Sequence, residues 1–342
     1  MPDRVRVGLV GLGAISFAHE AGYAELGEAC QLTALCDIDE EAAASRASAA
    51  GATPYTQYAA LVACPDVDLV DITAPHPLHY PMARAALLAG KHVLVEKPIA
   101  VTSEQGAELI ALARSRGLTF SVAENTRFVI AYQQAVSVLQ SGQLGEIRTV
   151  RTLIAGSEVH RIQNPRLWHG KAPYGGVILD SAVHHFYLFK WWFGGVRDLQ
   201  AFASRIVPEG EVEDNALILG HLANGAEFQL YVSCTMEIPW TERVEVYGST
   251  GGMVIDQLAN PVVKVYAGAD DVDGSALKDV PPDPLGWKFN SMLAEIRDFV
   301  SAVSDGRPPL VDPSDAVYAL VAAEAAMRSA DSGQPVYLDR GV

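Results

Sequence analysis

The stretch Gly8-Leu9-Val10-Gly11-Leu12-Gly13-Ala14-Ile15-Ser16 decides the fold of the first part of this chain. An apolar run that ends at Val10 is typical of a buried strand, and the glycines after it allow a tight turn into a helix. In a dinucleotide-binding turn, Gly11 makes the bend and Gly13 lets the backbone approach a pyrophosphate at the helix N-terminus. Ser16 replaces the third glycine of that fingerprint and is small enough to keep the helix near the sheet. The cofactor-binding candidates in this turn are Gly11, Gly13, Ala14 and Ile15.

A carboxylate follows the second apolar run, at Asp37, 24 residues after Gly13. It can accept hydrogen bonds from an adenosine ribose hydroxyl, and it would repel a 2′-phosphate. Because no Arg or Lys lies within three residues of Asp37, the sequence favours NAD over NADP as cofactor. The alternative interpretation of Asp37 is a residue that caps the following helix.

Apolar runs and helical stretches alternate through residues 1–123. Near-continuous apolar runs suit parallel strands buried on both faces, and we expect them at 4–10, 31–36, 68–73, 91–96 and 119–123. Alanine-rich helices are expected at 40–50, 81–89 and 104–116. A capping box at Thr102-Ser103-Glu104-Gln105 starts the last helix and Gly117 ends it. The alternation predicts an α/β fold with an N-terminal Rossmann-type, doubly wound parallel sheet.

The pattern changes after residue 123. Helices are expected at 136–139, 175–192, 287–303 and 314–329, and an exposed loop at 268–286. Alternating strands are expected at 216–222, 226–234, 243–247, 253–256 and 262–267, with a hairpin turn at Asn224-Gly225. We therefore predict two domains, 1–123 and 124–342. The second is α+β with a largely antiparallel open sheet, and its C-terminal helix can pack back on the first domain.

The charge balance excludes several kinds of partner. The 342 residues contain 25 Lys and Arg against 41 Asp and Glu, a net charge of −16, which would repel nucleic acid and anionic membranes. The four cysteines show no C-x-x-C spacing, so neither a metal ribbon nor a redox pair is expected. The chain opens on a strand and has no run of 18 apolar residues, which predicts a cytoplasmic protein.

Two short motifs carry the chemistry. In Val93-Leu94-Val95-Glu96-Lys97-Pro98, an ammonium ends a strand beside a φ-locked proline, so it can be aimed into the cleft where a nicotinamide would lie. In Asp180-Ser181-Ala182-Val183-His184, a carboxylate and an imidazole lie four residues apart and share a helix face. Each motif alone is more often a solvated charge or a local hydrogen bond. With a cofactor fold, they indicate proton transfer at a secondary alcohol.

Weaker signals surround these motifs. Trp168, His169 and Tyr174 lie just ahead of Gly175-Gly176 and are candidates for a substrate-contacting loop, or for ordinary surface packing. His184 and His185 are adjacent, so on a helix they point about 100° apart and make a poor pair of metal ligands. No metal is expected.

In this pattern the chain resembles the Gfo/Idh/MocA oxidoreductases, a family named for glucose-fructose oxidoreductase, inositol dehydrogenase and rhizopine catabolism proteins. The matching residues run in family order across most of the chain. They are residues 8–13, Asp37, Ile72-Thr73-Ala74-Pro75 with His79, Glu96-Lys97-Pro98, Asn125-x-Arg127-Phe128, Gly175-Gly176 and Asp180-x-x-x-His184.

The resemblance implies a Rossmann domain, a second domain whose open sheet supports homodimers or homotetramers, and NAD(P)-dependent redox chemistry on sugars, inositols or related polyols. By resemblance, Lys97, Asp180 and His184 are the catalytic set, and Arg127 is a substrate-binding candidate. The further cofactor-binding candidates are Thr73, Ala74, Pro75, His76, His79, Glu96, Lys97 and Asn125.

The chain departs from the family pattern at three positions. Many members have Asn where this chain has His76, a further Asp where it has Tyr187, and Gly where it has Ala182. Two alternatives to a dehydrogenase stay open. One is an enzyme that keeps NAD bound and oxidises a sugar transiently, for glycoside cleavage or internal redox exchange. The other is a dinucleotide-binding sensor that acts through partner proteins.

Overall fold

The computed structural model describes residues 4–165, 167–172, 175–277, 280 and 286–338. It divides into two compact units. The first contains Met1–Phe128 with Lys288–Val317, and the second contains Val129–Trp287 with Tyr318–Val342. None of the helices formed by the described residues has the length and apolarity needed to cross a membrane.

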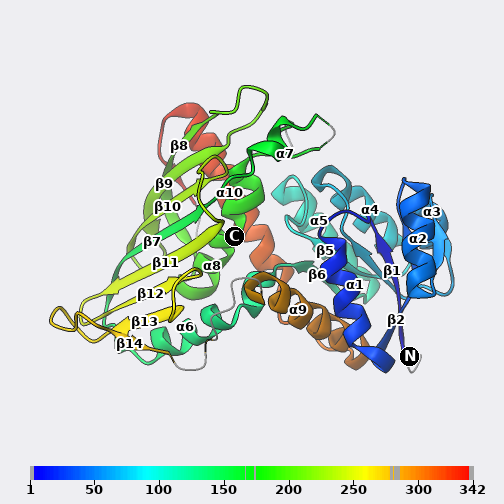
Figure 1. The fold of residues 1–342 in the computed structure, drawn as a ribbon, viewed down its shortest axis with the longest axis horizontal. Coiled ribbons are helices and arrows are strands. Elements are labelled where there is room, and N and C mark those ends of the chain that lie inside the picture. The colour runs from blue at the N-terminus through cyan, green and yellow to red at the C-terminus, as the bar shows by residue number, and fades with distance from the viewer. Residues whose placement is uncertain (1–3, 166, 173–174, 278–279, 281–285, 339–342) are drawn as a thin grey trace. The chain divides into compact units, whose positions relative to one another are not determined.

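The first unit is built on a six-stranded parallel sheet with strand order β3-β2-β1-β4-β5-β6 (Figure 1). Its strands are β1 Val5–Val10, β2 Cys30–Cys36, β3 Thr53–Tyr55, β4 Leu69–Ile72, β5 His92–Glu96 and β6 Phe120–Ala123. The helices between them are α1 Ser16–Glu25, α2 Glu40–Ala50, α3 Tyr58–Ala63, α4 His76–Leu88 and α5 Ser103–Arg116. This confirms the predicted doubly wound parallel sheet.

Helices cover both faces of this sheet. Leu9 packs with Leu35 and with Ala43 and Ala47 of α2, whereas a Cβ at Gly8 would lie 2.9 Å from the Leu61 side chain of α3. Successive strand residues point to opposite faces, so α2 and α3 lie on opposite sides. The strands are apolar on both faces for this reason.

A helix from the C-terminal part of the chain completes the first unit. Helix α9, Gly286–Asp305, places Ile296, Phe299 and Val303 in one buried cluster with Val5 and Leu94 of the sheet. The approach is close, because a Cβ at Gly22 of α1 would lie 2.6 Å from the Ile296 Cδ1 atom. Residues 288–317 therefore belong with the first unit, although the sequence placed them with the second domain.

Local signals in the sequence account for the helix ends. The Thr102 Oγ1 atom accepts a hydrogen bond from the Gln105 N–H at 3.3 Å, and Gly117 closes α5 with φ +63°. The predicted cap and stop of that helix are thus confirmed. The helix predicted at 81–89 begins earlier, at His76, since Pro77 lies in its first turn and Pro81 is accommodated inside it.

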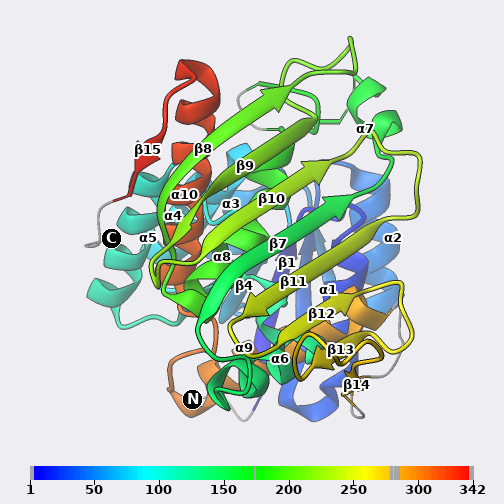
Figure 2. The ribbon, with the colours of Figure 1, turned by 90° about the vertical axis from the view of Figure 1, so that its left-hand side faces the viewer.

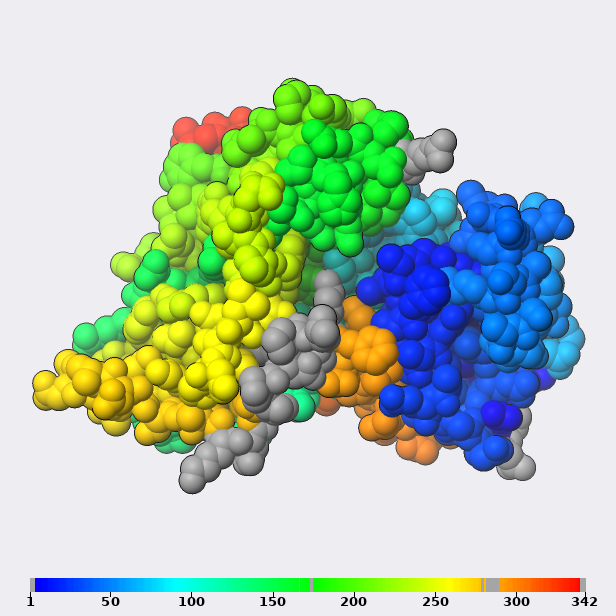
Figure 3. All heavy atoms as spheres, viewed as in Figure 1, coloured from blue at the N-terminus to red at the C-terminus, as the bar shows by residue number. Residues whose placement is uncertain are grey.

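The second unit is built on a nine-stranded sheet, ordered β14-β13-β12-β11-β7-β10-β9-β8-β15. Its strands are β7 Ile147–Ala155, β8 Val196–Ser204, β9 Asn215–Leu222, β10 Glu227–Ser233, β11 Thr241–Gly248, β12 Gly252–Asp256, β13 Val263–Tyr266, β14 Ser275–Ala276 and β15 Val336–Tyr337. Only β7 and β10 pair in parallel, so the sheet is mixed and mostly antiparallel, as predicted. Residues 268–277 of the expected loop lie at the surface and contain β14 (Figure 3), whereas Val280 is buried and Gly286 already begins a helix.

Helices cover one face of this sheet. They are α6 Ile130–Gln140, α8 Val183–Phe193 and most of α10 Pro313–Ser332, while α7 Val159–Gln163 lies at one end. Phe189 of α8 packs on Phe228 of β10 with ring centroids 5.1 Å apart, and the Tyr318 hydroxyl donates to the Val196 carbonyl at 3.0 Å. Figure 2 looks onto the opposite face, where Phe202 and Leu219 are 56% and 39% exposed.

We expect Phe299→Ala to lower the free energy of unfolding of the first unit by about 3–5 kcal/mol, because it leaves a cavity where α9 meets the sheet. Arg297→Ala is the matched control on the same helix. Its side chain is 61% exposed, so a change below about 0.5 kcal/mol is expected. Denaturant unfolding of both variants measures the difference, and equal small losses would show that α9 is not part of this core.

Candidate active site

The glycine turn after β1 packs tightly against the chain at Gly11 and has free space beside Gly13. Gly11 has φ +88°, and a Cβ there would lie 2.6 Å from the Ala74 backbone nitrogen, so only glycine fits. The Gly11 N–H donates to the Cys36 carbonyl at 2.9 Å, and the Thr73 hydroxyl donates to the Gly11 carbonyl at 2.6 Å. A Cβ at Gly13, in contrast, would meet no atom within 4 Å. The structure thus leaves the free space that a pyrophosphate requires at the predicted position.

Asp37 holds this turn in place. Its Oδ2 atom accepts a hydrogen bond from the Leu12 N–H at 2.6 Å, and its Oδ1 atom accepts one from the Asp39 N–H at 2.9 Å. The N-cap of α2 is Asp39, whose side chain accepts from Glu41 and Ala42. Asp37 is therefore not the helix cap that was its alternative interpretation, and it lies beside the glycine turn.

Arg46 brings a positive charge to the same turn. The sequence argument missed it because it considered only the three residues on either side of Asp37. The Arg46 Nη1 atom donates to the Leu12 carbonyl at 2.7 Å, and the guanidinium lies 4.0 Å from the centre of the Phe17 ring. Arg46 comes from α2, nine residues after Asp37, and reaches the turn only because α2 packs back on the sheet. Its Nη2 atom also pairs with Glu20 at 2.7 Å.

The segment after β4 is fixed by a buried histidine. His79 is fully buried, and its ring nitrogens lie 2.7 Å from the carbonyl oxygens of Ala74 and Pro98. Burial lowers its pKa, while the two carbonyl contacts favour a protonated ring. The His76 ring is also buried and lies 5.5 Å from that of His79. His79, a cofactor-binding candidate, therefore ties the end of β4 to the segment after β5.

Lys97 follows β5 at the edge where the glycine turn lies. Strand register pairs Val95 with Ile72, and Ile72 with Val10, so Glu96, Thr73 and Gly11 lie at the same level and Lys97 follows one residue further on. The carboxyl edge of a parallel sheet is where ligands bind in such folds. The Lys97 N–H donates to the Glu96 Oε2 atom at 3.0 Å.

The remaining candidates of the first unit lie in a short 3₁₀ helix, Asn125–Phe128. The Asn125 side-chain amide is buried and donates to the Ser291 hydroxyl of α9 at 2.8 Å. Arg127 is partly exposed in the same turn. The Asn125 side chain is therefore engaged within the protein itself.

In the second unit, Asp180 and His184 do not lie on one regular α-helix. Ile178–Ala182 form a π-helical turn, and α8 begins only at Val183. The prediction of a single α-helix from residue 175 is wrong here. Asp180 and His184 are four residues apart, but the chain between them passes through a π turn, which is wider than the α-helical turn that would place both on one face. Such turns occur often at functional sites. Both side chains are partly exposed at this junction.

Gly176 and Glu213 explain how this turn starts. Gly176 has φ +100°, and a Cβ there would lie 2.5 Å from the Glu213 carboxylate. The Glu213 Oε1 atom accepts a hydrogen bond from the Ile178 N–H at 3.0 Å. Burial raises the pKa of Glu213, and the Ile178 N–H opposes that shift. The absence of a side chain at Gly176 therefore makes room for a half-buried carboxyl beside the π turn.

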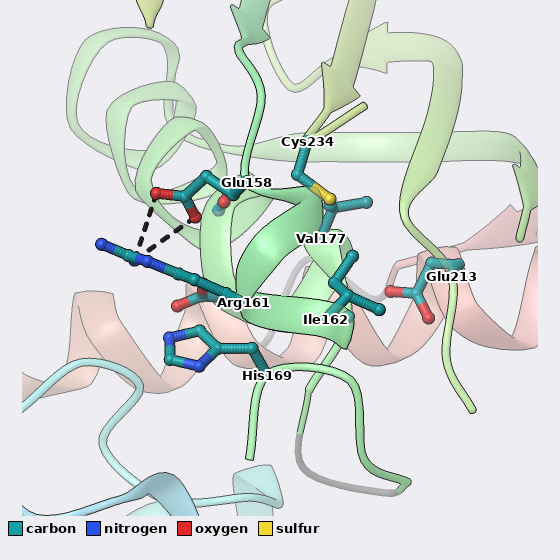
Figure 4. Close-up of a pocket in the computed structure, with 10 residues that line it drawn as sticks. Glu158, Arg161, Ile162, His169, Val177, Glu213 and Cys234 are labelled. Carbon is teal, nitrogen blue, oxygen red and sulfur yellow. Dashed lines mark hydrogen bonds and ion pairs between the residues drawn. The ribbon is translucent and has the colours of Figure 1, made fainter. Parts of the chain in front are cut away.

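Asp180 lines a pocket in the second unit (Figure 4). Four side chains that the sequence did not predict share it: Glu158, Arg161, Glu213 and Cys234. They come from three separate segments, and no motif joins them. An ion pair joins Arg161 and Glu158 at 3.1 Å, and burial raises the pKa of the Cys234 thiol to about 12. The other lining residues are Ile162, His169, Gly176, Val177 and Ser181.

The structure also places the loop candidates and one departure from the family pattern. His169 lines the pocket, and the Trp168 ring stacks on the His169 ring with centroids 4.1 Å apart. Tyr174 lies outside the described residues. Tyr187 is 1% exposed, so the departure at this position is a core side chain. Among the described residues, no group of three or more His, Cys, Asp or Glu side chains could hold a metal ion.

Comparison with known proteins decides the family. Residues 5–124 match the model of the oxidoreductase family with an NAD-binding Rossmann fold, and residues 132–254 match the Gfo/Idh/MocA C-terminal domain. The chain belongs to the Gfo/Idh/MocA oxidoreductase family. Its members of known name include dehydrogenases and reductases, so this Gfo/Idh/MocA protein is an oxidoreductase with an NAD-binding domain.

Individual relatives agree with this assignment. An uncharacterised oxidoreductase of Synechocystis sp. is 33% identical over 270 residues, which cover 74% of this chain and 69% of that protein. The trans-1,2-dihydrobenzene-1,2-diol dehydrogenase of Bos taurus is 31% identical over 238 residues, covering 69% and 67%. A solved levoglucosan dehydrogenase, in complex with NADH and levoglucosan, shares the fold with a TM-score of 0.88 at 23% identity, covering 98% and 99%.

We expect Gly13→Ala and Gly11→Ala to separate cofactor binding from folding. Gly11→Ala should lower the free energy of unfolding by more than about 1 kcal/mol, because a Cβ would be strained and would collide with Ala74. Gly13→Ala should change stability by less than about 0.5 kcal/mol, since the added methyl points into open space.

NADH fluorescence titration then completes the comparison. The Gly13→Ala methyl should weaken NADH binding at least about tenfold, because it occupies the space next to the pyrophosphate. Unchanged affinity in a stable Gly13→Ala protein would place the cofactor elsewhere.

Proposed function

We propose that this protein is an NAD-dependent dehydrogenase of a secondary alcohol in a sugar, an inositol or a related cyclic polyol. The observation that carries the proposal is the position of Lys97, which follows β5 beside the Gly11 turn at the carboxyl edge of a family Rossmann sheet. The levoglucosan dehydrogenase that shares the fold was solved with NADH and an anhydro sugar, which supports this substrate class.

In the proposed mechanism, three side chains act on one substrate hydroxyl. NAD, when bound, supplies the hydride acceptor. His184 removes the hydroxyl proton, for which an imidazole is suited near neutral pH. Lys97 stabilises the oxygen as it gains carbonyl character, and Asp180 orients the substrate or His184. Arg127, Trp168, His169 and Tyr174 remain proposed substrate contacts.

The lining of the pocket supports a polyhydroxylated substrate. Carboxylates at Glu158, Asp180 and Glu213 and the Arg161 guanidinium give several hydrogen-bonding groups around a small apolar area at Ile162 and Val177. Sugar rings present hydroxyls at their edge and C–H groups on their faces. The charged side chains of the pocket can bond the hydroxyls, and the apolar side chains can pack on the C–H groups. Asp180 is one of the residues that line this pocket, which supports the proposal that it contacts the substrate.

We also propose that the protein is cytoplasmic and that it self-associates. All four cysteines are unpaired, as in a reducing compartment. On the open face of the nine-stranded sheet, Phe202, Leu219 and Tyr247 are each more than a third exposed. Exposed apolar side chains on an open sheet face suit an interface, and a second copy of the chain would cover them.

For the catalytic assignment, NADH formation is followed by absorbance with NAD, and separately with NADP, across inositols, aldoses and 1,5-anhydro sugars. We expect one compound to support turnover with NAD, and Lys97→Met to lower kcat about a hundred- to a thousandfold because the developing charge loses its partner. Lys264→Met, on β13 of the second unit, is the control and should keep full activity.

Two outcomes would count against this assignment. Near-normal turnover by Lys97→Met with NAD still bound would remove Lys97 from the mechanism. Silence across the whole panel, with NADH binding confirmed by fluorescence, would favour an enzyme that keeps its NAD bound or a sensor.

For the proposed self-association, we expect light scattering to give the mass of a dimer or tetramer. Leu219→Lys should reduce that mass, because the added charge would be buried between the two copies. Leu258→Lys, at a site 50% exposed and outside the strands, is the matched control and should leave the mass unchanged. A monomeric wild-type protein would refute the proposed self-association.

A further inference from the structure

A buried histidine outside the proposed catalytic set contacts Glu96, the residue before Lys97. His19 is on α1, which packs over the sheet, and it is 1% exposed (Figure 1). Its Nδ1 atom lies 2.7 Å from Asp71 Oδ2 on β4, and its Nε2 atom lies 3.1 Å from Glu96 Oε1 at the end of β5. The imidazole therefore bridges two carboxyl groups on neighbouring strands.

The hydrogen-bond partners determine how many protons this ring carries. A neutral imidazole has one N–H, whereas an ionised carboxylate only accepts, so both contacts are satisfied together only by an imidazolium. Asp71 Oδ2 also accepts from the Tyr23 hydroxyl at 2.8 Å, and Glu96 Oε2 accepts from the Lys97 N–H, which agrees with ionised carboxylates. Burial alone would lower the pKa of His19, but the charges and hydrogen bonds of Asp71 and Glu96 outweigh it and hold the pKa well above 6.5.

Other ionisable groups also face this cluster. Against the effect of burial, the hydrogen bond from His19 is the main influence that lowers the pKa of Glu96, and the charges of Lys97 and of His79 on α4 act in the same direction. Tyr23 lies on α1, and Glu295 faces the cluster from α9, with Glu124 nearby after β6. Burial, together with the negative charge of Glu96, raises the pKa of Glu295 well above 4.5, which favours its neutral form. Within this group His19 is the residue that contacts both Asp71 and Glu96.

The bridge reaches Lys97 through one side chain. Glu96 uses one oxygen for His19 and the other for the Lys97 N–H at 3.0 Å, so its carboxylate is fixed at both ends. Pro98, on the other side of Lys97, has its carbonyl oxygen 2.7 Å from His79. The backbone that carries Lys97 is thus held from α1 on one side and from α4 on the other.

We propose that His19 is a positioning residue: as a buried imidazolium it clamps Glu96, and Glu96 in turn fixes the peptide from which Lys97 projects toward the reacting oxygen. The catalytic consequence rests on the proposed role of Lys97. The clamp itself is a property of the folded chain and does not depend on any substrate.

The first test uses the unmodified full-length protein with NAD and needs no substrate. NMR of the ¹⁵N-labelled histidine rings is expected to show both His19 nitrogens protonated at neutral pH and above. A neutral tautomer at neutral pH would overturn the proposal. Because no variant is involved, this result decides the protonation state even if substitutions at His19 do not fold.

The second test follows hydrogen exchange of the Lys97 amide, again with NAD alone. His19→Gln is expected to speed exchange at Lys97 at least about tenfold, since Glu96 loses the charged hydrogen bond that holds it. Tyr23→Phe is the matched control, because it removes one bond to Asp71 and leaves the His19–Glu96 contact intact. Equal exchange at Lys97 in wild type and a folded His19→Gln would overturn the clamp.

The third test uses the compound that supports turnover. His19→Gln should lower kcat about ten- to a hundredfold with little change in KM for NAD, as expected when a reacting group is misplaced. In a Lys97→Met background the same substitution should have almost no further effect. Multiplicative losses in the double variant would refute a role exerted through Lys97. If no compound supports turnover, the proposed dehydrogenase fails, while ring protonation and amide exchange still decide the clamp.

Discussion

The close approach of Gly11 to Ala74 is the constraint on which the first unit's functional edge depends. Because a Cβ at Gly11 would lie 2.6 Å from the Ala74 nitrogen, the turns after β1 and β4 can only touch through a glycine. That contact places the Thr73 hydroxyl on the Gly11 carbonyl and brings three strand ends to one level. The free space beside Gly13 exists because the other side of the turn is already filled. A rigid edge of this kind lets the chain hold a reactive group without relying on a flexible loop.

Buried or half-buried carboxylates that accept backbone N–H groups fix the functional segments in both units. Asp37 accepts from Leu12 in the glycine turn, Glu96 accepts from Lys97, and Glu213 accepts from Ile178 in the π turn. Such charge-assisted bonds are stronger than neutral ones, and each carboxylate would be costly to bury without them. The same type of interaction thus fixes the glycine turn, the peptide of Lys97 and the segment that carries Asp180.

The sequence predicts best where one local signal is sufficient. The parallel strands of the first unit, the Thr102 cap and the spacing of Lys97 from the glycine turn all follow from short patterns. Strand β7 was missed because Arg148 and Arg151 interrupt its apolar run, and β3 because it is only three residues long. The pocket residues Glu158, Arg161 and Glu213 converge from distant segments, so no pattern could join them. The π turn was missed because helical periodicity does not reveal an inserted residue.

Arg46 is a support of the glycine turn that the sequence pattern did not reveal. A three-residue window around Asp37 contains no cation, yet α2 brings this guanidinium to the turn. Its Nη1 and Nη2 atoms are already engaged by the Leu12 carbonyl and by Glu20, and the side chain is only 12% exposed. A cation held in this way cannot leave the turn without giving up both partners. Arg46 therefore supports the glycine turn from α2, while Asp37 holds the same turn through the Leu12 N–H, so a side chain from a distant helix and one from a strand end fix the same loop.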